Sequence, residues 1–210
     1  MENLNLILIG GGGHCKSVID VAESAGYTIL GILDRPEEVG KKVLGYEVIG
    51  TDSEIAKYVD KAVFVVTVGQ VKSPALRIKL HNMVEQAGGK LATIVSPSAH
   101  VSKYASVGEG TVVMHQAIVN ADAKVGKGCI INTFANIEHD VEIGDYCHIS
   151  TGAMINGGAK IGDSTFIGSQ SVVNQMTSIV GGAIIASLSV VNKDILEKGI
   201  FAGTPAKRIG

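Results

Sequence analysis

The stretch INTFANIEHDVEIGDYCHI, residues 131–149, has isoleucine at every sixth position. The same rhythm runs from Val95 to Val191, where seventeen successive positions, six residues apart, are all Val or Ile. A small or β-branched residue lies four places after each of the first sixteen. Neither the 3.6-residue period of a helix nor the simple alternation of a strand produces this pattern. A six-residue repeat with one large and one small inward position predicts a parallel β-helix.

Three six-residue sides make one coil of 18 residues, so residues 18 apart stack on one edge of a three-sided prism. Two sets of residues have this spacing: Gly108, Gly126, Gly144 and Gly162, and also Asn156, Asn174 and Asn192. We expect both sets at corners of the prism with positive φ, which glycine and asparagine tolerate. Seventeen repeats predict nearly six coils.

The first ninety residues alternate predicted strands with predicted helices, which indicates a parallel sheet with right-handed crossovers. Strands are expected at 4–9, 28–33, 62–68 and 90–95, and helices at 14–25, 52–59 and 74–87. The fold class is therefore an N-terminal α/β Rossmann-like domain followed by a parallel β-helix. We predict three parts: the α/β domain at residues 1–91, the β-helix at 92–195 and a capping tail at 196–210.

The bulk properties exclude several partners. A net charge of −2 gives no general electrostatic basis for binding nucleic acid or an anionic membrane. The apolar run at residues 4–9 is too short to cross a bilayer and lacks the flanks of a signal peptide. We therefore expect a cytoplasmic protein. The broad sides of the prism, with little aromatic surface, predict a homotrimer packed side to side.

The repeat carries its most distinctive chemistry at Glu138-His139-Asp140. Ile137 and Val141 face inward, so the three residues between them lie on an outward corner. A carboxylate beside a histidine orients one ring nitrogen, raises the pKa and leaves the other nitrogen free as a general base. A solvated turn of mixed charge is the alternative, and the residues alone do not decide between the two.

Two other groups bear on this corner. Gly157 lies 18 residues beyond His139, one coil above it, and together with Gly158 it offers backbone N–H groups to a developing oxyanion. His148 is nine residues after His139, so the two histidines could meet only across a subunit interface. A zinc site between subunits, as in a hexapeptide-repeat carbonic anhydrase, needs three histidine ligands. No third partner is convincingly placed, so we expect no metal.

The α/β domain has a glycine-rich turn, Gly10 to Gly13, between its first strand and first helix. Such a turn lets the backbone approach phosphate at a helix N-terminus. The dinucleotide fingerprint G-x-G-x-x-G is incomplete and the domain is short, so a nucleoside diphosphate is favoured over a nicotinamide cofactor. Asp34 ends the second strand, where an acid meets a ribose or base, and Arg35 could meet phosphate. Gly69 lies at the same sheet edge, although ordinary tight turns also explain these loops.

Together these segments resemble the hexapeptide-repeat acyltransferases of the sialic-acid O-acetyltransferase and nucleotide-amino-sugar N-acetyltransferase family. The resemblance covers essentially the whole chain. It rests on Gly10–His14, residues 132–140, the run IGDYCH at 143–148 and the tail GTPAKR at 203–208. It implies a left-handed β-helix, a homotrimer with active sites between subunits and acetyl-CoA as co-substrate.

The resemblance also implies roles for individual residues. His139 matches the general base of the family, and Asp140 matches the carboxylate that orients it. Substrate binding is implied for Gly13, His14, Asp34, Arg35, Gly69, Asn132 and Glu138, and acetyl-CoA binding for His148, Gly157, Gly168 and Ser187. The family's Gly/Ala-rich run near the end of the helix reads Ala186-Ser187-Leu188-Ser189 here, a departure at the pantetheine contacts.

These patterns lead us to expect an N-acetyltransferase of polysaccharide biosynthesis. It would move an acetyl group from acetyl-CoA to the amine of a nucleotide-linked amino-deoxy-sugar, expected to be a 4-amino sugar. O-acetylation of a sialic acid uses the same base and differs only in the acceptor. A non-catalytic solenoid that binds a sugar nucleotide is the third reading.

Overall fold

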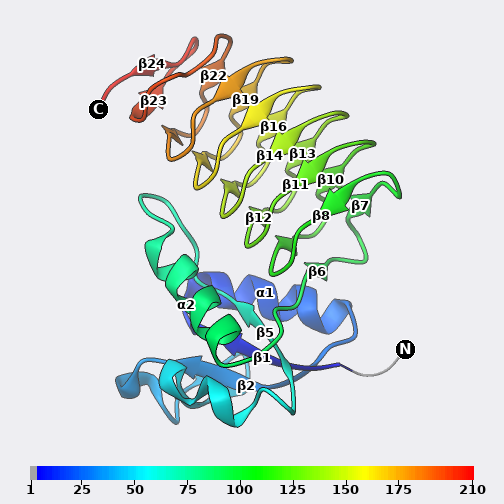
Figure 1. Ribbon diagram of the computed structural model, residues 1–210, viewed down its shortest axis with the longest axis vertical. Coiled ribbons are helices and arrows are strands. Elements are labelled where there is room, and N and C mark those ends of the chain that lie inside the picture. Colours follow the sequence, from blue (N-terminus) through cyan, green and yellow to red (C-terminus); the bar gives the residue numbers. More distant parts are fainter. Residues whose placement is uncertain (1–3) are drawn as a thin grey trace.

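The computed structural model describes residues 4–210 as an α/β domain followed by a stack of coils (Figure 1). The domain contains five strands in the order β3-β4-β2-β1-β5, parallel except for β3. Its elements are β1 (Asn5–Ile9), α1 (Gly13–Ser24), β2 (Thr28–Asp34), η1 (Pro36–Glu38), β3 (Lys42–Val43), β4 (Tyr46–Thr51), η2 (Asp52–Lys57), β5 (Val63–Val66) and α2 (Ala75–Gln86).

Three details of this domain differ from the sequence expectations. The β3–β4 hairpin was not predicted, and its two strands extend the sheet beyond β2 to one edge. The predicted helix at 52–59 is a 3-10 helix, η2, and the strand predicted at 90–95 is reduced to β6 (Ile94–Val95). The interior strand β1 is buried from Leu6 to Ile9, as its unbroken apolar run predicts.

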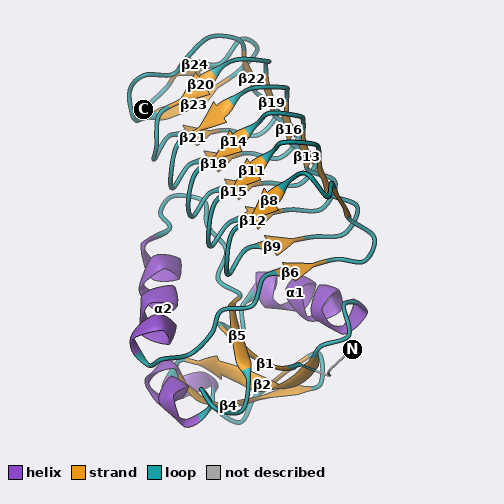
Figure 2. Ribbon diagram, turned by 45° about the vertical axis from the view of Figure 1, so that its right-hand side comes forward, coloured by secondary structure: helices purple, strands orange, loops and turns teal. Residues whose placement is uncertain are grey.

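The two faces of the sheet have different covers. One face packs on α1 and on the first coils, through Val18, Ile94 and Met114. The other face packs on α2 and η2, through Ile55, Leu80 and neighbouring side chains. Helix α1 therefore lies between the sheet and the β-helix, as Figures 1 and 2 both show.

The repeats form a left-handed parallel β-helix with three faces. What we call the docked face contains β6, β9 (Val112–Val113), β12 (Ile130–Ile131), β15 (His148–Ile149), β18 (Phe166–Ile167) and β21 (Ile184–Ile185). The apolar face contains β7 (His100–Val101), β10 (Ile118–Val119), β13 (Asn136–Ile137), β16 (Met154–Ile155), β19 (Val172–Val173) and β22 (Val190–Val191). The charged face contains β8 (Ser106–Val107), β11 (Lys124–Val125), β14 (Glu142–Ile143), β17 (Lys160–Ile161) and β20 (Ser178–Ile179).

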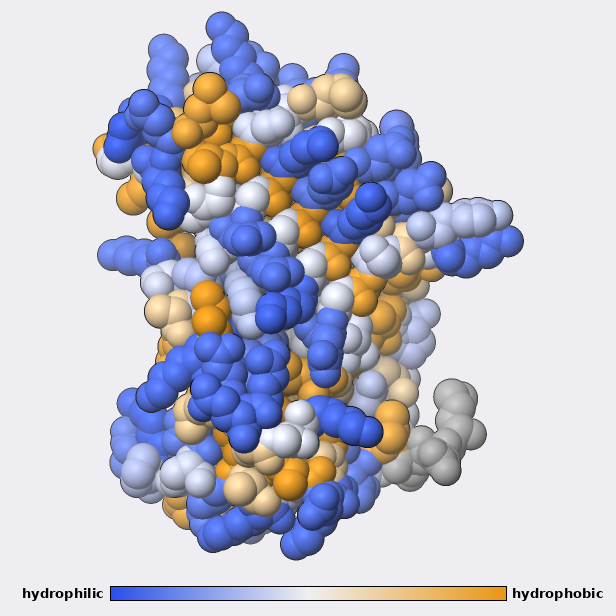
Figure 3. Space-filling view, in the orientation of Figure 1, coloured by the Kyte–Doolittle hydropathy of each residue, from blue (hydrophilic) through white to orange (hydrophobic). Residues whose placement is uncertain are grey.

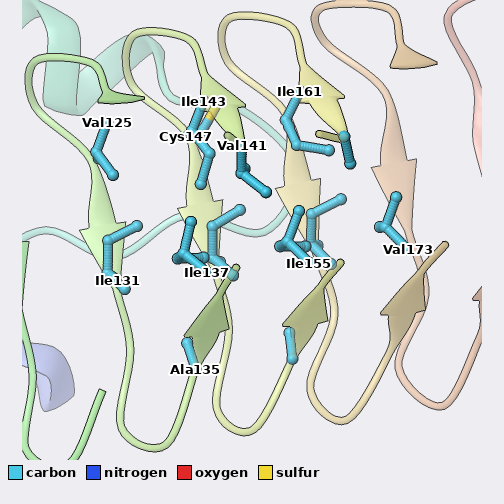
Figure 4. Packing of buried hydrophobic residues seen from close by; sticks show 14 of the residues in the cluster. Val125, Ile131, Ala135, Ile137, Val141, Ile143, Cys147, Ile155, Ile161 and Val173 are labelled. Atoms are coloured by element: carbon cyan, nitrogen blue, oxygen red, sulfur yellow. The ribbon is translucent and has the colours of Figure 1, made fainter. Parts of the chain in front are cut away.

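The second residue of each strand points into the prism, so the aliphatic side chains of successive coils stack on one another (Figure 4). Ile131, Ile137 and Ile155 are completely buried, and the small position is filled by residues such as Ala135 and Cys147. Strands pair with those 18 residues away, for example Ile137 with Ile155. This is the packing that the six-residue rhythm predicts.

The corners need glycine for a reason other than the expected one. From Val107 to Ile185, positive φ occurs three residues after each inward aliphatic residue; Phe134, Asp140 and Tyr146, for example, have φ of 60°, 60° and 56°. Gly126 comes directly after an inward residue and has no positive φ; its missing Cβ leaves room for the Gly144 backbone, 2.7 Å from where that atom would lie. Close approach of successive coils, and not backbone conformation, therefore requires the glycine column. The stacked asparagines also lack positive φ.

The last segment returns to the stack. Strand β23 (Ile200–Ala202) pairs with β21 in parallel, and β24 (Lys207–Arg208) pairs with β23 in antiparallel. Phe201 and Ala206 pack against the core of the prism, so this segment covers the last coil. Within residues 4–210, no helix is long and apolar enough to span a bilayer.

Candidate active site

Glu138, His139 and Asp140 occupy the turn between β13 and β14, on what we call the His139 edge of the prism, where the apolar and charged faces meet. His139 Nδ1 lies 2.7 Å from Asp140 Oδ2, and both side chains are about two-thirds exposed, at 66% and 64%. This hydrogen bond, followed by the negative charges of Asp140 and Glu138, raises the pKa of His139 above its usual value. Nε2 is left for another partner.

Gly157 lies directly above the imidazole. A Cβ at this position would lie 2.7 Å from His139 Cε1 and 2.8 Å from Nε2. Of the two backbone donors expected here, the N–H of Gly158 is occupied, because it donates to the His139 carbonyl over 3.0 Å. The N–H of Gly157 has no partner among the described residues. One oxyanion donor, not two, is therefore available.

Glu138 is held by two amides. Asn120 Nδ2 donates to its Oε2 over 3.0 Å, and Asn136 Nδ2 donates to its Oε1 over 2.9 Å. These two hydrogen bonds fix both carboxylate oxygens of Glu138 beside His139. Glu138, His139 and Asp140 line an open groove of about 780 Å³. The groove continues over Asn156, Gly157, Gly158, Lys160, Gln175 and Met176.

A second group of predicted residues lies elsewhere, between the docked face and the α/β domain. His148 is 8% exposed; its Nδ1 lies 2.8 Å from the Gln70 carbonyl oxygen and its Nε2 lies 3.2 Å from Asn132 Nδ2. The His14 ring is 6.4 Å from the His148 ring, and a Cβ on Gly69 would touch His14 at 3.8 Å. Burial, and then the charge of Arg77, lower the pKa of both histidines to about 4. Neutral imidazoles therefore line this interface.

The glycine-rich turn is organised by Asp34. Its Oδ2 accepts a hydrogen bond from the Gly11 N–H over 2.7 Å, and its Oδ1 accepts one from the Arg35 N–H over 2.7 Å. Gly13 opens α1, and a Cβ there would meet nothing within 4 Å, so the helix N-terminus is sterically open. The Arg35 side chain instead pairs with Glu37, 3.2 Å away, and it is 70% exposed. Asp34 thus shapes the turn.

The predicted acetyl-CoA residues Gly168 and Ser187 touch at the edge between the docked and apolar faces. A Cβ on Gly168 would overlap the backbone nitrogen of Ser187. Gly157 lies on a different edge, so one chain alone does not bring all the predicted acetyl-CoA residues together. Within the described part of the chain, no cluster of three His, Cys, Asp or Glu side chains is arranged to hold a metal ion.

Sequence reasoning missed Gln70 and Arg77. Both are buried, and Arg77 Nη2 donates to Gln70 Oε1 over 2.6 Å. A signal was present in α2: Arg77 and His81 share the helical spacing of Leu80 and Val84, which puts both polar residues on the buried stripe.

Comparison with known proteins supports both halves of the chain. A family model of the PglD N-terminal domain matches residues 5–84, and one of the bacterial transferase hexapeptide (six repeats) matches 122–157 and 140–175. A search of curated proteins finds no match.

Solved structures match over the full length. The acetyltransferase domain of PglB from Neisseria gonorrhoeae FA1090 is 31% identical, with a TM-score of 0.90 over 99% of this chain and 100% of that one. PerB from Caulobacter crescentus, solved in complex with CoA and GDP-perosamine, is 32% identical, with a TM-score of 0.91 over 98% and 97%. WeeI from Acinetobacter baumannii AYE, at 22% identity, TM-score 0.87 and coverage of 98% and 100%, shows the same fold. The chain therefore belongs to the hexapeptide-repeat acyltransferase family of sialic-acid O-acetyltransferases and nucleotide-amino-sugar N-acetyltransferases.

Proposed function

We propose that this protein transfers the acetyl group of acetyl-CoA to the amine of a nucleotide-linked 4-amino sugar. The observation that carries the proposal is the His139–Asp140 pair. Asp140 holds Nδ1 of the imidazole and leaves Nε2 free of that contact. The ring lies beneath Gly157 and lines an open groove. PerB, about a third identical over nearly the whole chain, was solved with CoA and GDP-perosamine bound. That pair of ligands supports the same two substrate classes here.

The reaction is direct attack in a ternary complex. The sugar nitrogen attacks the thioester carbonyl carbon, a C–N bond forms, and the C–S bond breaks to release CoA thiolate. His139 Nε2 takes the proton that the nitrogen loses, and Asp140 holds Nδ1–H and stabilises the imidazolium. The Gly157 N–H is the donor for the transient oxyanion.

The active assembly in this proposal is a trimer. The docked face is covered by the α/β domain, and the charged face carries ion pairs such as Lys160–Glu142, 3.5 Å apart. The apolar face instead exposes Ile118 and Met154, at 38% and 44%. On the side of the molecule drawn in Figure 3, hydrophobic residues lie between hydrophilic ones along the coils. A second copy on the apolar face closes the groove beside His139 and brings its own His148 toward it.

The nucleotide would be held by the α/β domain. The N–H groups at the start of α1, opened by Gly13, attract a diphosphate, and the Gly10–Gly13 turn admits it closely. Asp34 fixes this turn from below. His14 faces the β-helix, and Asn132 lies on the β-helix beside His148, where the sugar would lie. Arg35 contributes less than expected, since it already pairs with acidic neighbours.

The test is a screen of nucleotide-linked amino sugars and free sialic acid for acetyl-CoA-dependent release of CoA. We expect turnover with a 4-amino sugar nucleotide and about 10²- to 10⁴-fold slower turnover after His139→Ala. Lys103→Ala, at the same turn position two coils away, is the matched control and should behave as wild type. Turnover of sialic acid alone, or near-native turnover by the His139→Ala trimer, would overturn the proposal.

A further inference from the structure

Arg77 is the largest fully buried side chain of the described structure, at 1% exposure. Its Nη2 donates to Gln70 Oε1 and to the Tyr146 carbonyl oxygen, each over 2.6 Å, and more weakly to that of Cys147 over 3.4 Å. No carboxylate among residues 4–210 pairs with it, and its Nε and Nη1 atoms lack partners there. Burying a cation among neutral acceptors is costly, so stability alone does not explain Arg77.

Gln70 connects Arg77 to the β-helix. Its side-chain oxygen accepts from Arg77, and its Nε2 donates to the Ser164 carbonyl oxygen over 3.1 Å. With both ends of the amide engaged, the segment after β5 is fixed against the docked face. The main-chain carbonyl of the same residue then meets His148 Nδ1 at 2.8 Å.

These contacts determine the tautomer of His148. The Gln70 carbonyl can only accept, so Nδ1 must carry the hydrogen. Asn132 Oδ1 accepts from the Thr133 N–H over 2.8 Å, which leaves the Asn132 amide nitrogen as the group facing His148 Nε2 at 3.2 Å. An amide nitrogen only donates, so Nε2 is an acceptor. Around the ring lie Phe166, edge-on at 5.3 Å, and the titratable groups of His14 and Arg77.

We propose that Arg77 is a positioning residue: through Gln70 it fixes His148 as the Nδ1–H tautomer, whose Nε2 holds one N–H of Asn132, so that the pair offers substrate the second N–H of Asn132 and no donor from His148. This rests on the proposed function, in which this pair faces the neighbouring subunit's groove. His148 then cannot donate to the oxyanion, which leaves that role to the Gly157 N–H. The second N–H of Asn132 suits a carbonyl oxygen, such as one of pantetheine.

The first experiment reads the tautomer directly. Long-range ¹H–¹⁵N correlation spectra of the full-length protein, with His148→Gln used for assignment, should show protonated Nδ1 and bare Nε2 from pH 5.5 to 8. In Arg77→Met the signals should shift toward a tautomer mixture or begin to titrate. Lys79→Met, an exposed lysine on the same helix, is the control and should leave the spectrum unchanged. An Nε2–H tautomer in wild type, or an unchanged spectrum in Arg77→Met, overturns the proposal.

The second experiment separates positioning from folding. Arg77→Met should lower kcat/KM for acetyl-CoA about 10- to 100-fold. Its melting temperature should not fall, because an unpaired buried charge is removed. Arg77→Lys keeps the charge and one donor, so it should lie between wild type and Arg77→Met. If Arg77→Met does not fold, Arg77→Lys is the deciding variant. An Arg77→Lys protein with the kcat/KM and the spectrum of wild type refutes the positioning role of Arg77.

The two proposals can fail separately. The spectra need no sugar substrate, so they test the Arg77–Gln70–His148 connection even if no amino sugar is acetylated. A wild-type protein that releases no CoA with any nucleotide sugar, yet shows the predicted tautomer and its loss in Arg77→Met, would contradict the proposed function alone.

Discussion

Gly157→Ala tests whether the groove above His139 is built around that imidazole. The added methyl group would lie 2.7 Å from Cε1 and 2.8 Å from Nε2 of His139, against ordinary contacts of about 3.5–4.0 Å between non-bonded carbons. The backbone at Gly157 has no positive φ, so alanine fits the main chain. The ring must therefore yield by several tenths of an ångström or more. Since a misplacement near 1 Å costs about 10²-fold, we expect kcat/KM to fall about 10- to 100-fold.

The fold itself should tolerate this change. Ala121 occupies the same turn position two coils below Gly157, and Gln175 occupies it one coil above. His139 is two-thirds exposed and can move without opening the core. The melting temperature of Gly157→Ala should therefore stay within a few degrees of wild type, which corresponds to about 1 kcal/mol for a chain of this length.

A double-mutant cycle gives the decisive measurement. Steady-state kcat/KM is compared among wild type, Gly157→Ala, His139→Ala and the double variant. If the methyl group acts by displacing the imidazole, Gly157→Ala should have little further effect once the ring is gone. Equal losses in both backgrounds would refute the steric reasoning, and so would unchanged kcat/KM in the single variant.

Two further outcomes follow from the same edge of the prism. Asp140 raises the pKa of His139 by its hydrogen bond and its charge, and Glu138 adds a smaller effect through charge alone. A general base is lost as pH falls through its pKa. Asp140→Asn should therefore move the acid limb of the kcat/KM profile to lower pH, and Glu138→Gln should move it less. The opposite order in measured pH profiles contradicts this assignment. On the apolar face, Met154→Lys puts a charge into the expected subunit contact, so light scattering should give the mass of a monomer. Lys124→Glu on the charged face is the control and should leave the mass unchanged. A Met154→Lys protein that stays trimeric rejects that contact.

The β-helix was predictable because its determinants are local. Each turn of six residues fixes one inward aliphatic side chain, and pairing 18 residues away follows from the coil length alone. The position of His139 beneath Gly157 therefore came directly from residue numbers, and the structure shows it. The same arithmetic misassigned the glycine column, because close approach of two backbones depends on coil geometry that spacing does not contain.

The β3–β4 hairpin shows a different limit. Its two-residue turn is Leu44-Gly45, with φ of 48° and 94°, although such turns usually contain Asn-Gly or Asp-Gly. A leucine in this conformation gives no recognisable turn signal, so the segment looked like a loop. The contacts of Gln70 and Arg77 were hidden for another reason: they join residues 69 to 94 positions apart, across two domains.

The His139–Asp140 pair follows from turn geometry that most of the repeats share. In the turns from Gly110 to Leu188, the residue three places after the inward aliphatic has positive φ, and at His139-Asp140 the carboxylate is hydrogen-bonded to the imidazole of the residue before it. Among the turns, Ala121-Asp122 lacks the imidazole, and His115-Gln116 lacks the carboxylate. Only residues 139 and 140 combine an imidazole with a carboxylate, and Gly157 one coil above leaves the ring its space. The chemistry of the site thus depends on His139, Asp140 and Gly157, set into a repeated frame. Moving the histidine and its carboxylate by one turn would require moving the glycine with them.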